Sequence, residues 1–160
     1  MGLFLILLAA GDSTRLKSKI PKPFHIVNDK TLLEHSFNAF KDLHKIKRTV
    51  IVYNKKHKKY LNKLNLKRTL KIIGGKTRQE STFIALKKIK KMNCKKVLIH
   101  DSARPNPSKD LINKIIYNLV NNHAVVPVIK INDATKRVEK NVIFKNIQRN
   151  SLRFSQTPQG

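Results

Sequence analysis

The sequence has few of the residues that cross-link or stack small proteins. Its 160 residues include one cysteine, Cys94, and no tryptophan, and aromatic residues make up only 6%. A single cysteine excludes an internal disulfide and favours a reducing compartment. The six histidines are scattered, which excludes the ligand spacing of a zinc site. Sparse aromatic residues also leave no stacking platform for single-stranded nucleic acid.

Acidic residues are scarce as well. Nine aspartates and glutamates oppose 35 lysines and arginines, so the formal net charge is +26. Such an excess points to an anionic partner, which would be nucleic acid, an anionic membrane or a phosphorylated small molecule. The lysines are spread almost evenly and asparagine is abundant, which favours a compositional bias over a dedicated nucleic-acid surface. Both explanations stay open from the sequence.

Long hydrophobic runs are missing too. The apolar start of the chain, residues 3–10, is far too short to span a bilayer. It also lacks the basic residues and the small-residue cleavage site of a signal peptide. We therefore expect a first core strand there, no membrane partner and a cytoplasmic protein.

The remaining pattern alternates strands with helices. Apolar runs predict strands at residues 3–9, 48–53, 70–73, 96–100 and 124–131. Helices are expected after a capping box at Thr31 and Glu34, over 54–67, over 78–92 with Phe83 packed inward, and after Ser108. This order predicts an α/β, Rossmann-like domain with a mostly parallel sheet and helices on both faces. Residues 136–149 predict a projecting β-hairpin with its turn at Lys140 and Asn141.

Ligands of such folds bind outside the carboxyl ends of the strands. Three loops whose residues could bind a ligand or take part in catalysis lie there, at residues 10–22, 74–81 and 100–105. The convergence of these loops is a stronger indication of a site than any one of them alone.

The first loop has the outline of a triphosphate site. The run Ala9-Ala10-Gly11-Asp12-Ser13-Thr14-Arg15 follows the first strand, and Pro21-Lys22 comes seven residues later. Small residues let backbone N–H groups approach phosphate, and Arg15 and Lys22 could neutralise charge during phosphoryl or nucleotidyl transfer. The pattern is neither a dinucleotide fingerprint nor a P-loop, so an ordinary turn with two solvated cations is the alternative.

The second loop begins with the paired glycines Gly74 and Gly75. Such a pair permits positive φ angles and a close approach of a flat ligand to the backbone. Ser81, near the start of the following helix, could form a hydrogen bond with a nucleotide base. The alternative is a turn followed by an ordinary helix cap.

The third loop, His100-Asp101-Ser102-Ala103-Arg104-Pro105, is more specific. Asp101 at the end of a buried strand suits Mg²⁺, which prefers oxygen ligands and substrate phosphates. Arg104 could hold that carboxylate or a phosphate, and a purely structural Asp101–Arg104 pair is the alternative. His100 is expected to be packed or hydrogen-bonded rather than a metal ligand. The serines have no adjacent base, which argues against a hydrolase.

These segments, together with Gln156-Thr157-Pro158-Gln159, occur in the order that resembles the 2-C-methyl-D-erythritol 4-phosphate cytidylyltransferase family. The resemblance covers essentially the whole chain. It implies Mg²⁺-dependent transfer of CMP from CTP to 2-C-methyl-D-erythritol 4-phosphate, with release of pyrophosphate, in non-mevalonate isoprenoid biosynthesis. The partners implied are CTP, a polyol phosphate and a second copy of the chain.

The resemblance also implies roles for individual residues. The catalytic residues would be Arg15 and Lys22, which stabilise the five-coordinate phosphorus, and Asp101 would hold Mg²⁺. The nucleotide would be bound by the strand end and the first two loops, through Ala9, Ala10, Gly11, Asp12, Ser13, Thr14, Gly75, Arg78 and Ser81. The polyol phosphate would be bound by Arg104, Thr135, Arg149 and Thr157, with Arg149 reaching across a dimer through the arm 136–149.

The chain departs from the family pattern in two places. Asp133-Ala134-Thr135 stands where the family shows Asp-Thr, so either Thr135 replaces that threonine or a hydrogen bond is lost. The family also continues past Gly160, so we expect one nucleotidyltransferase domain, residues 1–160, that is incomplete at its C-terminus. The first departure keeps a second acceptor, such as ribitol 5-phosphate, as an alternative. A basic nucleic-acid-binding protein and an inactive scaffold that dimerises through the arm are alternatives from other classes.

Overall fold

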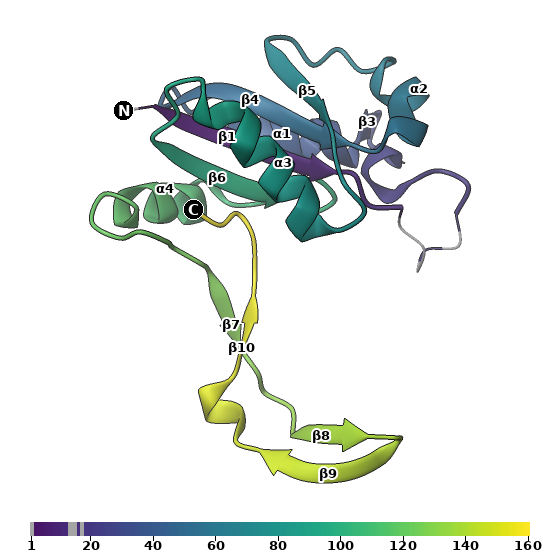
Figure 1. The fold of residues 1–160 in the computed structure, drawn as a ribbon, viewed down its shortest axis with the longest axis vertical. Helices are drawn as coiled ribbons and strands as arrows, with labels where there is room; N and C mark the ends of the chain where they lie inside the picture. Colours follow the sequence, from purple (N-terminus) through teal and green to yellow (C-terminus); the bar gives the residue numbers. More distant parts are fainter. Residues whose placement is uncertain (1, 13–15, 17) are drawn as a thin grey trace.

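A parallel four-stranded sheet forms the body of the protein. The structure is a computed structural model and describes residues 2–12, 16 and 18–160. The strands are β1 (Leu3–Ala9), β4 (Ile46–Tyr53), β5 (Thr69–Ile73) and β6 (Lys96–Asp101), in the spatial order β5-β4-β1-β6 (Figure 1). The predicted α/β fold with a parallel sheet is confirmed.

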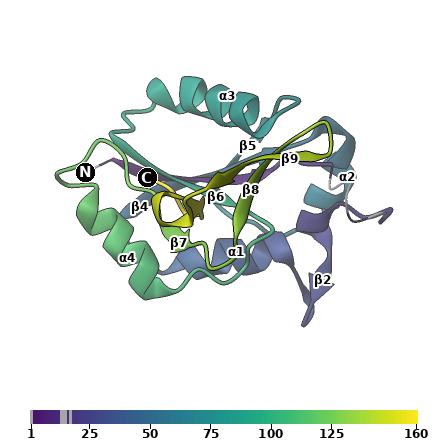
Figure 2. The same cartoon turned by 90° about the horizontal axis from the view of Figure 1, so that it is seen from below.

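Strand β1 is apolar along its whole length because both of its faces are covered. Leu5 and Leu7 contribute to one buried cluster, together with residues of α1 (Leu32–Lys41) and α4 (Lys109–Asn118). Phe4 and Ile6 point to the other face, where Ala85 and Ile89 of α3 (Arg78–Lys90) pack. Figure 2 shows α3 on one side of the sheet and α1 and α4 on the other. A strand buried on both sides reads as a continuous apolar run.

Local hydrogen bonds fix where the helices start. The side chain of Thr31 accepts from the backbone N–H of Glu34, and the Glu34 carboxylate accepts from the Thr31 N–H, as the capping box predicts. Ser108 caps α4 in the same way, through the N–H of Leu111. Thr77 caps α3 through the N–H of Glu80.

Three local predictions are wrong. The expected helix over 54–67 is reduced to η3 (Lys55–His57) and α2 (Lys58–Leu61), since its many lysines have no acidic partners one turn away. The expected strand over 124–131 shrinks to β7 (Val128–Lys130) because Pro127 has no N–H to donate. Phe83 is 64% exposed on α3 rather than packed inward.

The predicted arm is present. Strand β7 pairs antiparallel with β10 (Arg153–Ser155) to make a stem, and β8 (Thr135–Glu139) pairs with β9 (Val142–Ile147) to make the hairpin. Lys140 and Asn141 at its turn have φ angles of 46° and 65°, the left-handed values that a two-residue hairpin turn of type I′ needs. A short helix η4 (Arg149–Ser151) joins β9 to β10, and the arm projects away from the sheet (Figure 1).

A short helix and a small hairpin lie between β1 and α1. Helix η2 (Lys22–Phe24) follows Pro21 and buries Phe24. Strands β2 (Ile26–Val27) and β3 (Lys30–Thr31) form a small hairpin that leads into α1. None of the helices in the described part of the chain has the length and apolar character needed to cross a bilayer.

The central position of β1 predicts a large cost for truncating its core side chains. Leu5 is fully buried, so we expect Leu5→Ala to lower the free energy of unfolding by about 2–5 kcal/mol through lost packing and the cavity left behind. Ile26 is 71% exposed, so Ile26→Ala should change it by less than about 0.5 kcal/mol. Urea denaturation measures both values, and equal losses in the two variants would contradict this account of the core.

Candidate active site

The three predicted loops meet at the carboxyl edge of the sheet. They follow β1, β5 and β6, and together they line an open cavity of about 620 Å³. The residues lining it come from all three loops and the end of β1: Leu8, Ala10, Gly11, Leu16, Lys22, Pro23, Gly75, Lys76, Thr77, Arg78, Asp101, Ala103 and Arg104. The predicted convergence of loops therefore exists in the structure.

The first loop contributes a backbone wall and a cation. Ala10 and Gly11 line the cavity directly after β1, and a methyl group built on Gly11 would meet nothing within 4 Å. Lys22 lines it from the start of η2, where Pro21 and the buried Phe24 fix the chain. Ala9 is fully buried within the strand and does not line the cavity. Ser13, Thr14 and Arg15 lie outside the described residues.

The second loop is tied to the sheet. A methyl group on Gly74 would come within 2.7 Å of the Ser81 Oγ and 2.8 Å of the Ala10 Cβ, so this glycine allows the loops after β1 and β5 to touch. Neither Gly74 nor Gly75 has a positive φ, which makes that expectation wrong: close approach to the sheet, rather than a left-handed turn, requires the small residue at Gly74. Ser81 is buried and accepts from the Gly75 N–H at 3.1 Å, behind the cavity wall.

Asp101 lies between two guanidinium groups at the mouth of the third loop. Its Oδ1 accepts from Arg78 Nε at 2.9 Å, and its Oδ2 lies 3.5 Å from Arg104 Nε. Both arginines also donate to the C-terminal segment, Arg78 to Gln159 Oε1 and Arg104 to Gln156 Oε1. The carboxylate and its two arginines are partly exposed, so water screens these ion pairs. The pairs therefore add little to the stability of the fold, and their main effect is to orient the three side chains.

A buried hydrogen-bond chain holds the third loop from behind. His100 Nε2 lies 2.8 Å from the Arg104 carbonyl oxygen, which can only accept, so this nitrogen carries the proton of the neutral ring. His100 Nδ1 then accepts from the Thr157 hydroxyl at 3.0 Å, and Thr157 Oγ1 accepts from the Asp101 N–H at 3.3 Å. Burial lowers the pKa of His100, in keeping with a neutral ring. His100 is thus a hydrogen-bonded core histidine, as expected.

Three predicted ligands of the polyol phosphate lie outside the cavity. Thr157 is only 9% exposed and serves the chain behind Asp101 instead. Thr135 and Arg149 belong to the arm, where Thr135 donates to the Asp133 carbonyl oxygen and Arg149 to that of Asn132. Arg104 is the one of the four that lines the cavity.

Two residues that sequence reasoning missed lie next to the first loop. Asn54 donates to Asp12 Oδ1 at 2.8 Å, and His57 Nε2 lies 3.4 Å from the same oxygen. Asp12 itself does not line the cavity. Asn54 directly follows β4, and the rule that ligands bind at strand carboxyl ends marks that position as well as the three loops.

Comparison with known proteins places the whole arrangement in one family. A family model described as 2-C-methyl-D-erythritol 4-phosphate cytidylyltransferase matches residues 3–160. The chain belongs to this family. It is therefore a member of a family of nucleotidyltransferase enzymes, and the resemblance seen in its motifs is confirmed.

Individual relatives of the cytidylyltransferase family agree. The chain is 45% identical over 159 residues to the bifunctional enzyme IspD/IspF of Pelagibacter ubique, spanning 99% of this chain and 43% of that protein. It is 36% identical to the cytidylyltransferase of Wigglesworthia glossinidia brevipalpis, spanning 98% of this chain and 69% of that protein. The chain thus covers less than half of the first relative and about two thirds of the second.

Solved structures show the same fold. The bifunctional IspDF of Campylobacter jejuni superposes with a TM-score of 0.81 at 31% identity, over 99% of this chain and 40% of that one. The cytidylyltransferase of Francisella tularensis gives a TM-score of 0.79 at 27% identity, over 99% and 71% of the two chains. The cavity, the arm and the C-terminal segment thus belong to a fold that spans the whole chain.

Burial of His100 predicts a pH-dependent stability. An unfolded histidine takes up a proton near pH 6.5, whereas folded His100 does so only at lower pH. The free energy of unfolding should therefore be level above about pH 7 and fall as the pH drops below about 6.5, by at most about 1.4 kcal/mol per pH unit for one such group. Urea denaturation between pH 5.5 and 8 measures this slope.

The matched variants are His100→Gln and His123→Gln. His100→Gln should reduce the slope of the unfolding free energy against pH below pH 6.5. His57 should keep part of that slope, because burial lowers its pKa as well. His123 is exposed, so its replacement should leave the slope as in the parent. A slope that is unchanged in His100→Gln would contradict the assignment of a neutral, buried ring.

Proposed function

We propose that the protein transfers CMP from CTP to 2-C-methyl-D-erythritol 4-phosphate and releases pyrophosphate. The observation that carries this proposal is the cavity of about 620 Å³, which three family loops line with Lys22, Arg78, Asp101 and Arg104. Cationic side chains that could bind phosphates line the cavity, together with Ala10, Gly11 and one carboxylate. Membership of the cytidylyltransferase family supports CTP as the nucleotide and 2-C-methyl-D-erythritol 4-phosphate as the acceptor.

The reaction depends on the orientation of its two substrates and on neutralisation of their phosphate charge more than on a strong base. A phosphate oxygen of the acceptor attacks the α-phosphorus of CTP, a P–O bond forms, and the bond to the bridging oxygen of the β-phosphate breaks. The acceptor phosphate is already an anionic nucleophile, so orientation and charge neutralisation supply most of the acceleration. In this proposal Lys22 and Arg15 stabilise the charge that builds up around the α-phosphorus.

Mg²⁺ is part of the proposal. The described residues contain no group of three side chains that could hold a metal by themselves. Mg²⁺ commonly binds through one or two carboxylates together with substrate phosphates, so a single carboxylate at the cavity fits it. Asp101 would hold the ion by releasing Arg78 or Arg104 from one of its oxygens. The bound ion would neutralise the phosphate charge.

The acceptor site requires a second chain in this proposal. Thr135 and Arg149 lie on the arm, which projects away from the sheet (Figure 1), and neither residue lines the cavity of its own chain. If they bind the acceptor phosphate, they do so in the cavity of a partner, in a cytoplasmic homodimer. Apolar side chains on the hairpin are exposed and suit such an interface: Val138, Val142, Ile143 and Phe144.

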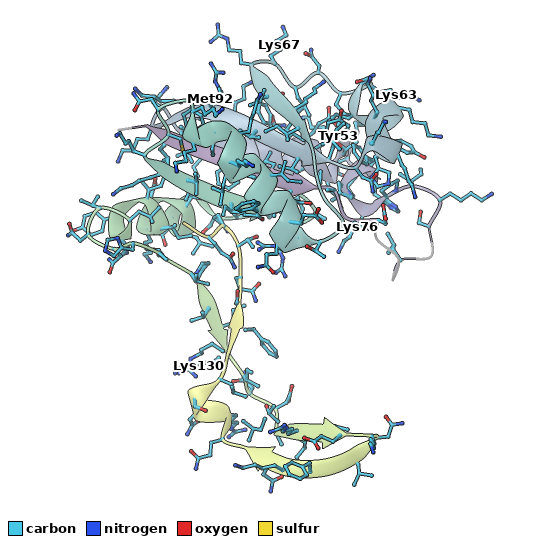
Figure 3. All side chains as sticks on the ribbon, viewed as in Figure 1. Tyr53, Lys63, Lys67, Lys76, Met92 and Lys130 are labelled. Atoms are coloured by element: carbon cyan, nitrogen blue, oxygen red, sulfur yellow. The ribbon has the colours of Figure 1, made fainter. Side chains whose placement is uncertain are left out.

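Two competing functions guide the choice of ligands for testing. Ala134 stands where the family shows a threonine, which keeps ribitol 5-phosphate as a second acceptor. The net charge of +26 keeps nucleic acid as a competitor. The lysines are spread along the chain: Lys63 follows α2, Lys76 follows β5 and Lys130 ends β7 (Figure 3). This spread favours a compositional bias over a dedicated nucleic-acid surface.

Calorimetric titration of the 160-residue chain with CTP, ATP, UTP and GTP, with and without Mg²⁺, tests the function. We expect selective, Mg²⁺-dependent binding of CTP. Lys22→Ala should weaken it about tenfold, as expected for the loss of a charged contact to phosphate, and Asp101→Asn should remove most of the Mg²⁺ dependence. The matched control is Lys63→Ala, an exposed lysine outside the cavity.

Failure of a folded parent to bind CTP would contradict the proposal. A random-sequence RNA serves as the competing ligand in the same titration. Tight RNA binding that weakens steeply with salt, in the absence of CTP binding, would favour a nucleic-acid-binding protein instead.

A separate experiment tests the arm. We expect the parent to elute as a dimer in light-scattering chromatography, and the double variant Ile143→Glu/Phe144→Glu to elute as a monomer, because each charge would lie in an apolar interface. Lys145→Glu, on the same strand, is the control and should remain dimeric. A monomeric parent would rule out the arm as a dimer interface.

A further inference from the structure

Asp12 is the acidic residue of the loop that follows β1. It lies next to Gly11, which lines the cavity, yet Asp12 is not among the lining residues. Its Oδ1 accepts from Asn54 Nδ2 at 2.8 Å and lies 3.4 Å from His57 Nε2. A carboxylate in a triphosphate-binding loop would repel phosphates, so its direction matters for a nucleotide site.

Asn54 is held at both ends of its amide. Its Oδ1 accepts from the Lys56 N–H at 3.0 Å and caps η3, while its Nδ2 donates to Asp12. Asn54 also follows the last residue of β4, which is buried in the sheet next to β1. A rigid part of the protein thus fixes the donor that Asp12 meets.

His57 adds a second contact to the Asp12 carboxylate, at a structural cost. The ring is 7% exposed and packs edge-to-face against Phe24, with ring centroids 6.0 Å apart. Its Nδ1 is buried and has no hydrogen-bond partner among the described residues. Burial lowers the pKa of His57, which favours the neutral ring, and Nε2 is the ring nitrogen that faces the Asp12 carboxylate.

A phenylalanine at position 57 would fill the same space without burying an unpaired nitrogen. Packing alone therefore does not explain a histidine at this position. The contact that the imidazole makes and a phenyl ring lacks is the one from Nε2 to Asp12.

We propose that Asn54 and His57 are positioning residues that hold the Asp12 carboxylate away from the phosphates of the bound nucleotide. This inference rests on the proposed function, since it assumes a triphosphate in the cavity. The pair keeps the acidic side chain of the loop outside the site, whose lining in this region consists of small residues and Lys22.

Calorimetric titration with CTP and with CMP tests the role of Asn54. Asn54→Ala frees the carboxylate, so we expect CTP to bind about fivefold to tenfold more weakly, and CMP, with fewer phosphate charges, to lose less. Adding Asp12→Asn to the same protein removes the repelling charge and should restore CTP affinity to near the parent value. The matched control, Asn62→Ala, removes an exposed amide from the same segment and should leave both affinities unchanged.

His57→Phe tests the second contact to Asp12 and separates positioning from stability. We expect its thermal unfolding midpoint to equal or exceed that of the parent, because the unpaired nitrogen is gone, while its affinity for CTP falls severalfold. A merely structural histidine would instead change stability and affinity in the same direction.

The outcomes distinguish this inference from the proposed function. A parent that binds CTP, with an Asn54→Ala variant that binds it equally well, overturns the role of Asn54 and leaves the function intact. A double variant that stays as weak as Asn54→Ala shows that Asn54 supports the loop by packing, and this also overturns the inference. A folded parent that binds no CTP overturns both.

Discussion

The positions of the side chains that line the cavity depend on the hydrogen bonds made by the neutral, buried ring of His100. It joins the Arg104 carbonyl oxygen on one side to the Thr157 hydroxyl on the other, and that hydroxyl receives the Asp101 N–H. Strand β6, the loop after it and the C-terminal segment are thereby fixed to one another. The side chains that face the cavity, Asp101 and Arg104, have fixed positions because the groups behind them have their hydrogen bonds satisfied.

Scarcity makes the carboxylates the informative residues of this chain. Nine acidic residues stand against 35 lysines and arginines, so most cations have no acid to pair with. Six of the nine have assigned partners in the described structure: Asp12, Glu34, Glu80, Asp101, Asp110 and Glu139. Glu34 and Glu80 accept from backbone N–H groups just before their helices. Asp110 and Glu139 form ion pairs on the surface. Of the remaining two, Asp101 lines the cavity, whereas Asp12 follows the lining residue Gly11 and is bound to Asn54 instead.

Local features of this fold could be read from the sequence, and long-range contacts could not. The apolar β1, the capping box at Thr31 and the hairpin turn at Lys140 depend on neighbours within a few residues, and their patterns are visible in the chain. Gly74 is required by contacts with Ala10, and Thr157 is held by a histidine 57 residues away. No periodicity encodes such pairs. The three loops were still predictable, because the topology of a parallel sheet brings strand ends together whatever their side chains do.

The stem of the arm continues directly into the segment that holds the two arginines of the cavity. Strand β10 ends at Ser155, the next residue donates its N–H to the Pro127 carbonyl oxygen, and the side chain of that same Gln156 accepts from Arg104. Three residues further on, Gln159 pairs with Ile99 of β6 and accepts from Arg78. The C-terminal strand of the arm thus runs directly into the glutamines that hold the two guanidinium groups around Asp101. A partner chain that bound the arm would contact the same segment of chain that positions Arg78 and Arg104.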